Sequence, residues 1–331
     1  MDLDAFVADR YPAWERLDEL SRRRDLTSAE TDELVDLYER VSTHLSLVRS
    51  TSPDPGLVSY LSAVLTRARL TASARRTTSW GDVARFFTHT FPGALYRTRR
   101  WWVATTVLNV AAAVLVGWWA VGHPEFFAEQ MTQEEIEAYV GTDFENYYSE
   151  FPHHEFAALV WTNNAWVSAQ AIAFGVLGLP TLWVLFQNTV NVGLAGALMV
   201  SHGRGSLFFG LILPHGLLEL TAVFVAGATG LRLFWSWIEP GDRTRAQSFA
   251  AEARSAFAVA LGLVPVLLVS GLIEGFVTPS SLPTWARIVV GVVAETAFLA
   301  YVVVLGRRAA RDGATGDLDE VDRGASVPTL G

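Results

Sequence analysis

The stretch from Leu207 to Gly230 constrains the fold most, because it is apolar and long enough to cross a bilayer, which takes about 20 helical residues. Its middle nevertheless holds Pro214, His215, Gly216 and Glu219. An ionisable side chain at the centre of a membrane helix costs about 2.5 kcal/mol or more, so His215 and Glu219 are expected to face protein or water. They are four residues apart, which places both on one helix face.

This face is the predicted intramembrane polar site. Its other expected members are Glu295, Asn163, Asn164 and Asn188. Two interpretations stay open: a functional polar site, or hydrogen bonds between helices that hold a bundle together. Pro214 and Gly216 are expected to be structural, the first kinking the helix and the second allowing close packing.

The composition extends this picture to the whole chain. Hydrophobic residues make up 51%, charged residues 18%, and the mean hydropathy is +0.27. Apolar runs predict six membrane spans, at about 101–121, 158–178, 181–200, 207–229, 256–277 and 286–306. The expected fold is therefore all-α, a polytopic membrane helix bundle. Spans two and three are joined only by residues 178–180 and could instead form a broken or re-entrant helix.

Charge sets the expected orientation. Arg97, Arg99 and Arg100 precede the first span, whereas the following acidic segment, residues 122–157, contains no arginine. Arginine-rich loops favour the cytoplasm, so both termini are predicted to be cytoplasmic and the acidic segment outside. Arg204 is the exception, because it lies in a loop predicted to be outside. The same topology puts Glu274 and Arg287 near the outer face, where they could form an ion pair.

Residues 1–100 are expected to form a cytoplasmic and interfacial helical domain. Residues 27–30 match a capping box, and apolar residues then recur every three or four positions until residues 53–55. A second amphipathic helix follows. The aromatic residues of 80–91 suggest either an interfacial helix or ordinary core packing. Residues 101–306 are the predicted transmembrane bundle, and 307–331 a disordered cytoplasmic tail.

Several separated motifs resemble the long form of the stage II sporulation protein M family. They are Asp36–Ser42, Pro53–Pro55, Phe86–Pro92, Asn163–Asn164, Phe174–Gly178, Gln187–Asn188, and Pro214–Gly216 with Glu219 and Ala226–Arg232. Thr189 departs from the pattern, which often has glycine after the asparagine. The resemblance implies a membrane protein of a cell-envelope complex, since the namesake is similar to an anchor for two peptidoglycan-degrading partners. It implies no catalytic residue.

Two functions remain open at this stage. The first is a non-enzymatic scaffold with no cofactor. Its expected partners are envelope membrane proteins such as peptidoglycan hydrolases, anionic lipids, and a second copy of the chain in a homo-oligomer. The second is a transporter or channel with a polar path through Glu219, Glu295 and His215. A zinc hydrolase is not favoured, because no third ligand beside His215 and Glu219 is evident. The net charge of −9 argues against nucleic acid.

Overall fold

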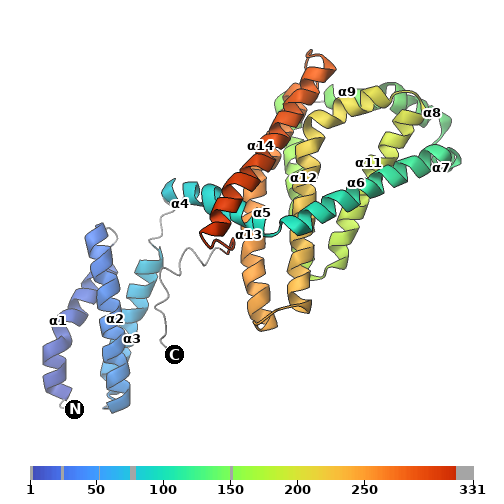
Figure 1. The fold of residues 1–331 in the computed structure, drawn as a ribbon. Helices are drawn as coiled ribbons and strands as arrows, with labels where there is room; N and C mark the ends of the chain where they lie inside the picture. The colour runs from blue at the N-terminus through green and yellow to red at the C-terminus, as the bar shows by residue number, and fades with distance from the viewer. Residues whose placement is uncertain (1–2, 24–25, 52, 75–79, 150–151, 318–331) are drawn as a thin grey trace. The chain divides into compact units, whose positions relative to one another are not determined.

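The computed structural model describes residues 3–23, 26–51, 53–74, 80–149 and 152–317. Within these ranges every regular element is a helix, which confirms the predicted all-α membrane bundle (Figure 1). The chain divides into two compact units, Met1–Val83 and Ala84–Gly331. This division comes earlier than the predicted boundary at residue 100, because residues 84–100 pack with the membrane helices.

The first unit is a bundle of three helices. They are α1 (Leu3–Arg22), α2 (Ser28–Thr51) and α3 (Pro55–Ala74). All three contribute to one core, including Trp14 and Leu17 from α1 and Leu61 and Val64 from α3, each 0% exposed. The apolar residues that recur every three or four positions in α2 are all buried: Leu34, Leu37, Val41, Leu45 and Val48. The unit therefore closes its own hydrophobic core.

The predicted capping box is present at the start of α2. The Glu30 amide donates to Thr27 Oγ1 at 3.3 Å, and the Thr27 amide donates to Glu30 Oε2 at 2.7 Å. The hydrogen bonds that the Thr27 amide and, next in size, the Thr27 hydroxyl donate to the Glu30 carboxylate lower the pKa of Glu30 to about 2. The box fixes the entry of the chain into α2.

The remaining helices belong to the second unit, except that the unit boundary between Val83 and Ala84 falls inside α4. They are α4 (Trp80–Arg85), α5 (Phe91–Arg97), α6 (Arg99–Gly122), α7 (Glu125–Gln130), α8 (Gln133–Ala138), α9 (Phe144–Asn146), α10 (His153–Ala173), α11 (Leu179–Ser201), α12 (Gly205–Ile238), α13 (Arg245–Leu272) and α14 (Thr284–Arg311). Short π-helical turns at Phe86–Thr90, Tyr139–Asp143 and Ile273–Val277 connect or extend them. The acidic segment is thus largely helical.

Among the described residues, five helices are long and apolar enough to cross a membrane: α6, α11, α12, α13 with its extension to Val277, and α14. They correspond to five of the six predicted spans. The exception is 158–178, where α10 forms instead; its polar residues, including Asn163 and Asn164, keep it out of this group. The 21 residues of α10 still give a length of about 30 Å.

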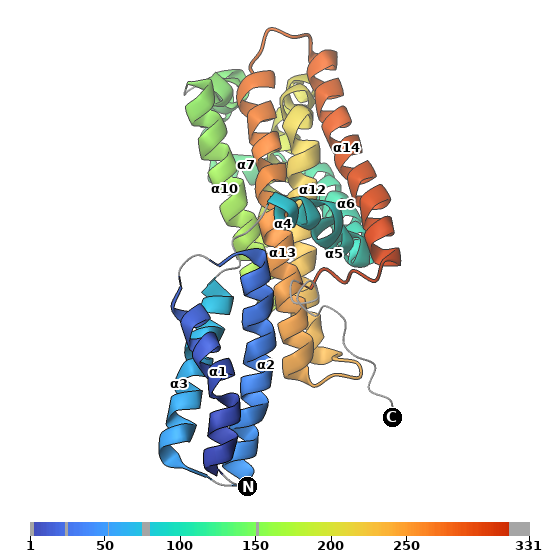
Figure 2. The ribbon, with the colours of Figure 1, turned by 90° about the vertical axis from the view of Figure 1, so that its left-hand side faces the viewer.

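Helix α10 runs beside α13 (Figure 2). Its start lies near Gly275, and the turn after its end lies near Gly230 of α12. Near its start, a Cβ on Gly275 would lie 2.7 Å from the Ala157 Cβ. Just after its end, a Cβ on Gly175 would lie 2.4 Å from the Gly230 carbonyl oxygen. The chain then turns through Gly178, whose φ of +78° suits glycine, directly into α11. The predicted spans 158–178 and 181–200 therefore lie mainly in two separate helices, α10 and α11.

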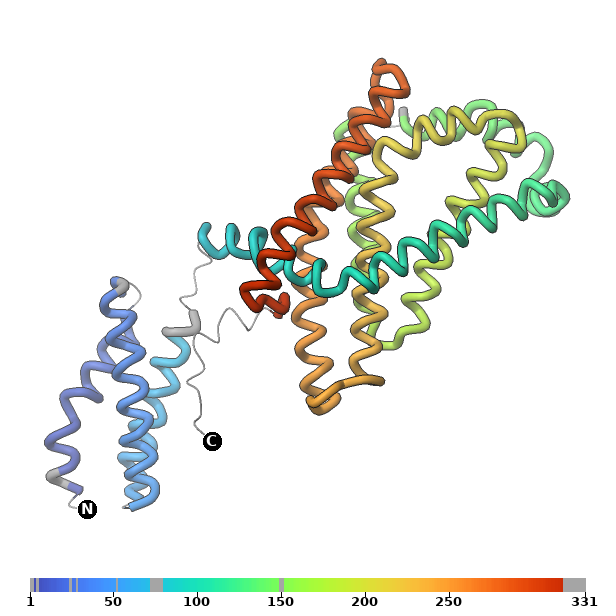
Figure 3. The backbone as a smooth tube through the Cα atoms, viewed as in Figure 1, coloured from blue at the N-terminus to red at the C-terminus, as the bar shows by residue number. Residues whose placement is uncertain are grey.

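Helix α12 bends sharply within its amino-terminal half (Figure 3). Pro214 lies inside this helix and cannot donate to the carbonyl of Gly210, which accounts for the bend. Helix α14 approaches the bend at Gly291, where a Cβ would lie 2.3 Å from the Pro214 carbonyl oxygen. Close packing was expected at Gly216, but a Cβ there would meet only Ile212 of the same helix, so Gly291 has this role.

The aromatic residues before the first span join the bundle core. Phe91 is 1% exposed and packs with Leu263 and Val302, and its ring lies where a Cβ on Gly262 would be. Phe86 and Phe87 pack against the same core. Of the two interpretations of this region, core packing therefore describes Phe91. Helix α5 is part of the second unit, which we call the membrane unit.

Candidate functional site

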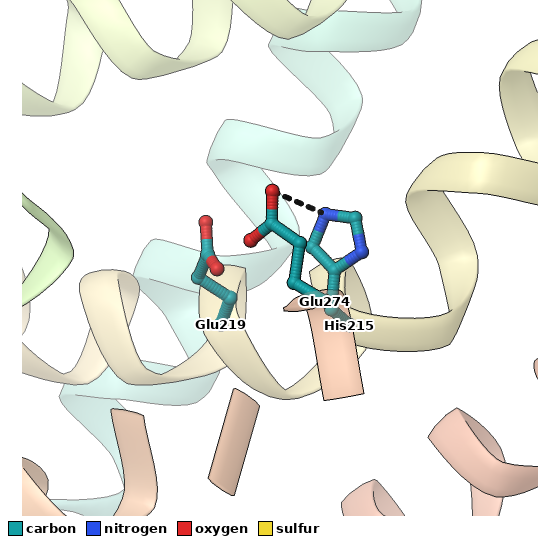
Figure 4. A group of neighbouring side chains, drawn as sticks. All are labelled: His215, Glu219 and Glu274. Atoms are coloured by element: carbon teal, nitrogen blue, oxygen red, sulfur yellow. Dashed lines mark ion pairs between the residues drawn. The ribbon is translucent and has the colours of Figure 1, made fainter. Parts of the chain in front are cut away.

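His215 and Glu219 lie together, as predicted, and a third ionisable residue joins them. The Glu274 Oε1 atom is 3.7 Å from His215 Nε2 (Figure 4). One nitrogen or carboxylate oxygen from each of His215, Glu219 and Glu274 lies within 4.8 Å of the others. We call these three residues the polar cluster. Its carboxylates point to the same space as the imidazole ring (Figure 4).

Two irregular helix segments position the polar cluster. His215 directly follows Pro214 in α12, and Glu219 comes one turn later on the same face. Glu274 lies in the π-helical turn Ile273–Val277, where the Thr278 amide donates to the Ile273 carbonyl at 2.9 Å. A π-turn widens the helix locally and is frequent at functional sites. Here it presents Glu274 to His215.

Neighbouring hydroxyl and amide groups hold the cluster in place. His215 Nδ1 is 3.3 Å from Thr278 Oγ1, and the Ser270 hydroxyl donates to the His215 carbonyl at 3.1 Å. Ser270 is also 3.4 Å from Glu219 Oε2, and the Asn164 side chain hydrogen bonds to Glu219. Helices α10, α12 and α13 therefore all contribute to one polar network.

The cluster is shielded from solvent. The side chains of His215 and Glu274 are 5% and 6% exposed. Within the described part of the chain, Glu274 Oε2 has no hydrogen-bond partner. The ring of Tyr148, from the acidic segment, lies 5.9 Å from the His215 ring, and burial raises the pKa of Tyr148 well above its usual range. The acidic segment thus covers the cluster.

The ion pair expected between Glu274 and Arg287 is not among the ion pairs of the described residues. Glu274 instead faces His215. Arg287 donates to the Thr278 carbonyl through Nη1 and to Thr284 Oγ1 at 3.1 Å. The π-turn rotates Glu274 into the bundle, and Arg287 is left to cap the turn that follows.

The other predicted site residues lie apart from the cluster, except Asn164. Glu295 accepts a hydrogen bond from Thr221 at 3.0 Å. The Asn188 side chain donates to the Val184 carbonyl of its own helix at 2.9 Å, and Asn163 is exposed on the bundle surface. The Asn188 bond therefore stays within α11 and is not the hydrogen bond between helices that the structural interpretation expected. Thr189, the departure from the family pattern, donates to Asn109 Oδ1 at 2.6 Å and links α11 to α6.

Sequence reasoning missed a second polar centre. Glu252 accepts from Arg97 at 2.6 and 2.9 Å and from Arg232 at 3.0 and 3.1 Å, which joins α13 to α5 and α12. Arg254 pairs with Asp317 in the same part of the unit. We call this part, marked by Arg97, Arg232 and Arg254, the basic end. The signal that could have revealed it is an acidic residue, Glu252, close to the arginines of the connection between α12 and α13.

Arg204, the exception to the predicted charge pattern, is paired within the acidic segment. Its Nη2 lies 3.7 Å from Glu145 Oε2 and donates to the Gly141 carbonyl at 3.2 Å. The loop between α11 and α12 therefore lies at the same end of the bundle as the acidic segment. The positive charge of Arg204 is offset locally.

Comparison with known proteins gives two matches to family models. The model described as stage II sporulation protein M matches residues 106–279, more than half of the chain and the part that contains the polar cluster. The model of a domain of unknown function (DUF8413) matches residues 4–73, which are α1 to α3. No curated protein and no solved structure has a significant match to the chain.

Proposed function

The chain belongs to the stage II sporulation protein M family and is an integral membrane protein, and from this premise we propose that it is a non-enzymatic scaffold in a cell-envelope complex. In this proposal the membrane unit is the anchor. The first unit recruits partners on the cytoplasmic side, and the acidic segment recruits partners outside, such as peptidoglycan hydrolases.

One observation carries the proposal: residues 1–83 form a compact unit whose core is complete without the membrane helices. Its central tryptophan, Trp14, is 0% exposed and donates to His44 Nδ1 at 3.1 Å. The core of this domain is built from its own three helices. In this proposal the surface of the domain binds other proteins, as a scaffold requires.

The charge distribution supports the orientation in this proposal. The basic end gathers arginines from α5, α12 and α13, and such arginine-rich regions favour the cytoplasm and anionic lipid. The other end carries the acidic segment. In this proposal α10 connects the two ends of the bundle, as each of the five apolar helices does. With six such connections, the start of α6 and the end of α14, which both carry arginines, lie at the basic end.

The test is a crosslinked pull-down from native membranes, read beside the cell-envelope phenotype at matched membrane expression. We expect deletion of residues 1–83 to lose the cytoplasmic partners. A triple change of the exposed Glu129, Glu134 and Glu137 to Gln is expected to weaken the outer partners. The matched control is Glu219→Gln inside the bundle, which is expected to keep both. Full retention of partners and phenotype after the deletion would contradict the scaffold.

Transport is the second candidate function, because three ionisable side chains lie within 4.8 Å of one another inside the bundle. Glu295 is not one of them, so the path differs from the expected one through Glu219, Glu295 and His215. Under this function Glu219→Gln keeps every partner but abolishes the phenotype. Flux measured in liposomes with the purified protein and this variant then distinguishes the two functions.

A further inference from the structure

We propose that His215, Glu219 and Glu274 bind a divalent transition-metal ion of the Zn²⁺ class inside the membrane unit. This site goes beyond the scaffold function, which requires no metal. It also supplies the third ligand that the spacing of His215 and Glu219 could not reveal. Its ligands come from two helices that are separated by the loop between α12 and α13.

The ligand set matches the chemistry of such an ion. One imidazole nitrogen and two carboxylate oxygens are ligands that Zn²⁺ accepts, with a further position left for water or another donor. Bonds of about 2.0 Å in a tetrahedral arrangement place ligand atoms about 3.3 Å apart. In the polar cluster the ligand atoms lie within 4.8 Å, and the His215–Glu274 pair is already at 3.7 Å. Small rotations of the carboxylates close the remaining difference.

The burial of Glu274 requires a counter-charge or a proton. Its side chain is 6% exposed, one oxygen faces His215, and Oε2 is without a hydrogen-bond partner in the described part of the chain. Buried charges in proteins are paired or coordinate metals, since an uncompensated one costs several kcal/mol. No arginine occurs among the contacts of the cluster residues described above. A dication between the two carboxylates would offset both charges.

The groups around the cluster are those that orient metal ligands. Thr278 lies against His215 Nδ1, so the Nδ1 proton can be donated to its hydroxyl, which leaves Nε2 free towards Glu274. Ser270 and Asn164 hydrogen bond to the Glu219 carboxylate. The π-turn that carries Glu274 is the kind of local irregularity that often marks a functional site. Each ligand is therefore held by an outer partner or by the backbone.

The test uses untagged full-length protein in detergent, stripped with a chelator and titrated with Zn²⁺, with Co²⁺ as a spectroscopic substitute. The site variants are Glu274→Gln and His215→Gln, which preserve size. The matched control is Glu295→Gln, a membrane carboxylate outside the cluster. A second control replaces the exposed His153 and His154 with Gln. Melting temperatures are measured with and without Zn²⁺ for every protein.

We expect wild type and both controls to bind about one Zn²⁺ per chain and to melt at a higher temperature with it. Glu274→Gln and His215→Gln should lose at least about 100-fold in affinity, since even loss of a partner outside the coordination sphere costs about 10–100-fold. Their melting temperatures in chelator show whether they fold. Absence of uptake by folded wild type, or unchanged affinity in a folded site variant, would overturn the metal site and leave the scaffold test unaffected.

Discussion

At the residue scale, Glu252 shows how one carboxylate can fix the basic end. It is 14% exposed and lies between Arg97 and Arg232, which are 25% and 28% exposed. Four nitrogen–oxygen distances of 2.6 to 3.1 Å join it to these two guanidinium groups. Ion pairs with two parallel hydrogen bonds of this kind are stronger than a solvent-exposed ion pair. Removing the negative charge of Glu252 would leave two half-buried arginines without their ion-pair partner.

We therefore predict that Glu252→Gln destabilises the membrane unit by about 2 to 3 kcal/mol, somewhat less than for fully buried pairs. Unfolding of the purified protein in detergent measures this. The control is Glu239→Gln, an exposed carboxylate nearby whose oxygen accepts from Trp235 at 2.8 Å. The control should cost less than about 1 kcal/mol. Equal effects in the two variants would show that the two arginines do not depend on Glu252.

At the element scale, glycines set how closely the helices approach each other. Helix α10 and the turn after it lie against α12 at Gly175 and Gly230. A Cβ on Gly230 would lie 2.1 Å from the Ala171 carbonyl oxygen. Small residues are typical of such membrane-helix interfaces, because they let backbones come together. The contact matters for the site, since α10 also carries Asn164, which bonds to Glu219.

Gly230→Ala is predicted to push α10 away from α12 at a cost of about 2 kcal/mol, the range for overpacked cores. Hydrogen exchange of α10 amides should quicken, because the helix loses its close contact with α12 at Gly230. Gly122→Ala serves as the control, since a Cβ there has nothing within 4 Å. Unchanged exchange in Gly230→Ala would mean that this interface relaxes without cost.

The helices of the bundle are predicted from the sequence better than the contacts between them. The apolar runs predict six spans, five of which match the helices that are long and apolar enough to cross a membrane. The spacing of His215 and Glu219 predicts their shared face. Glu274 was expected to pair with Arg287 but faces His215, because its orientation depends on a π-turn that has no clear sequence signature. Glu252 was missed for a similar reason: its partners lie on helices far away in sequence. Local periodicity specifies elements, whereas contacts between elements depend on packing.

At the scale of the whole molecule, the division into two units predicts two separate unfolding events. The first unit, residues 1–83, has a core centred on Trp14, whereas the second has its own core around Phe91 and Leu263. A domain of this size has a stability of about 4 to 10 kcal/mol. Removing a buried aromatic ring costs about 3 to 5 kcal/mol, a large part of that stability.

Trp14→Ala should therefore loosen or unfold the first unit while the membrane helices remain intact. Hydrogen exchange measured peptide by peptide in the full chain checks this: amides of α1 to α3 should exchange faster, and those of α12 and α13 should not change. Leu70→Ala is the control, because Leu70 is 64% exposed and its truncation should stay within about 0.5 kcal/mol. Faster exchange in α12 after Trp14→Ala would show that the two units fold as one. That result would contradict the proposal that the first unit is a separate domain that recruits partners to a membrane anchor.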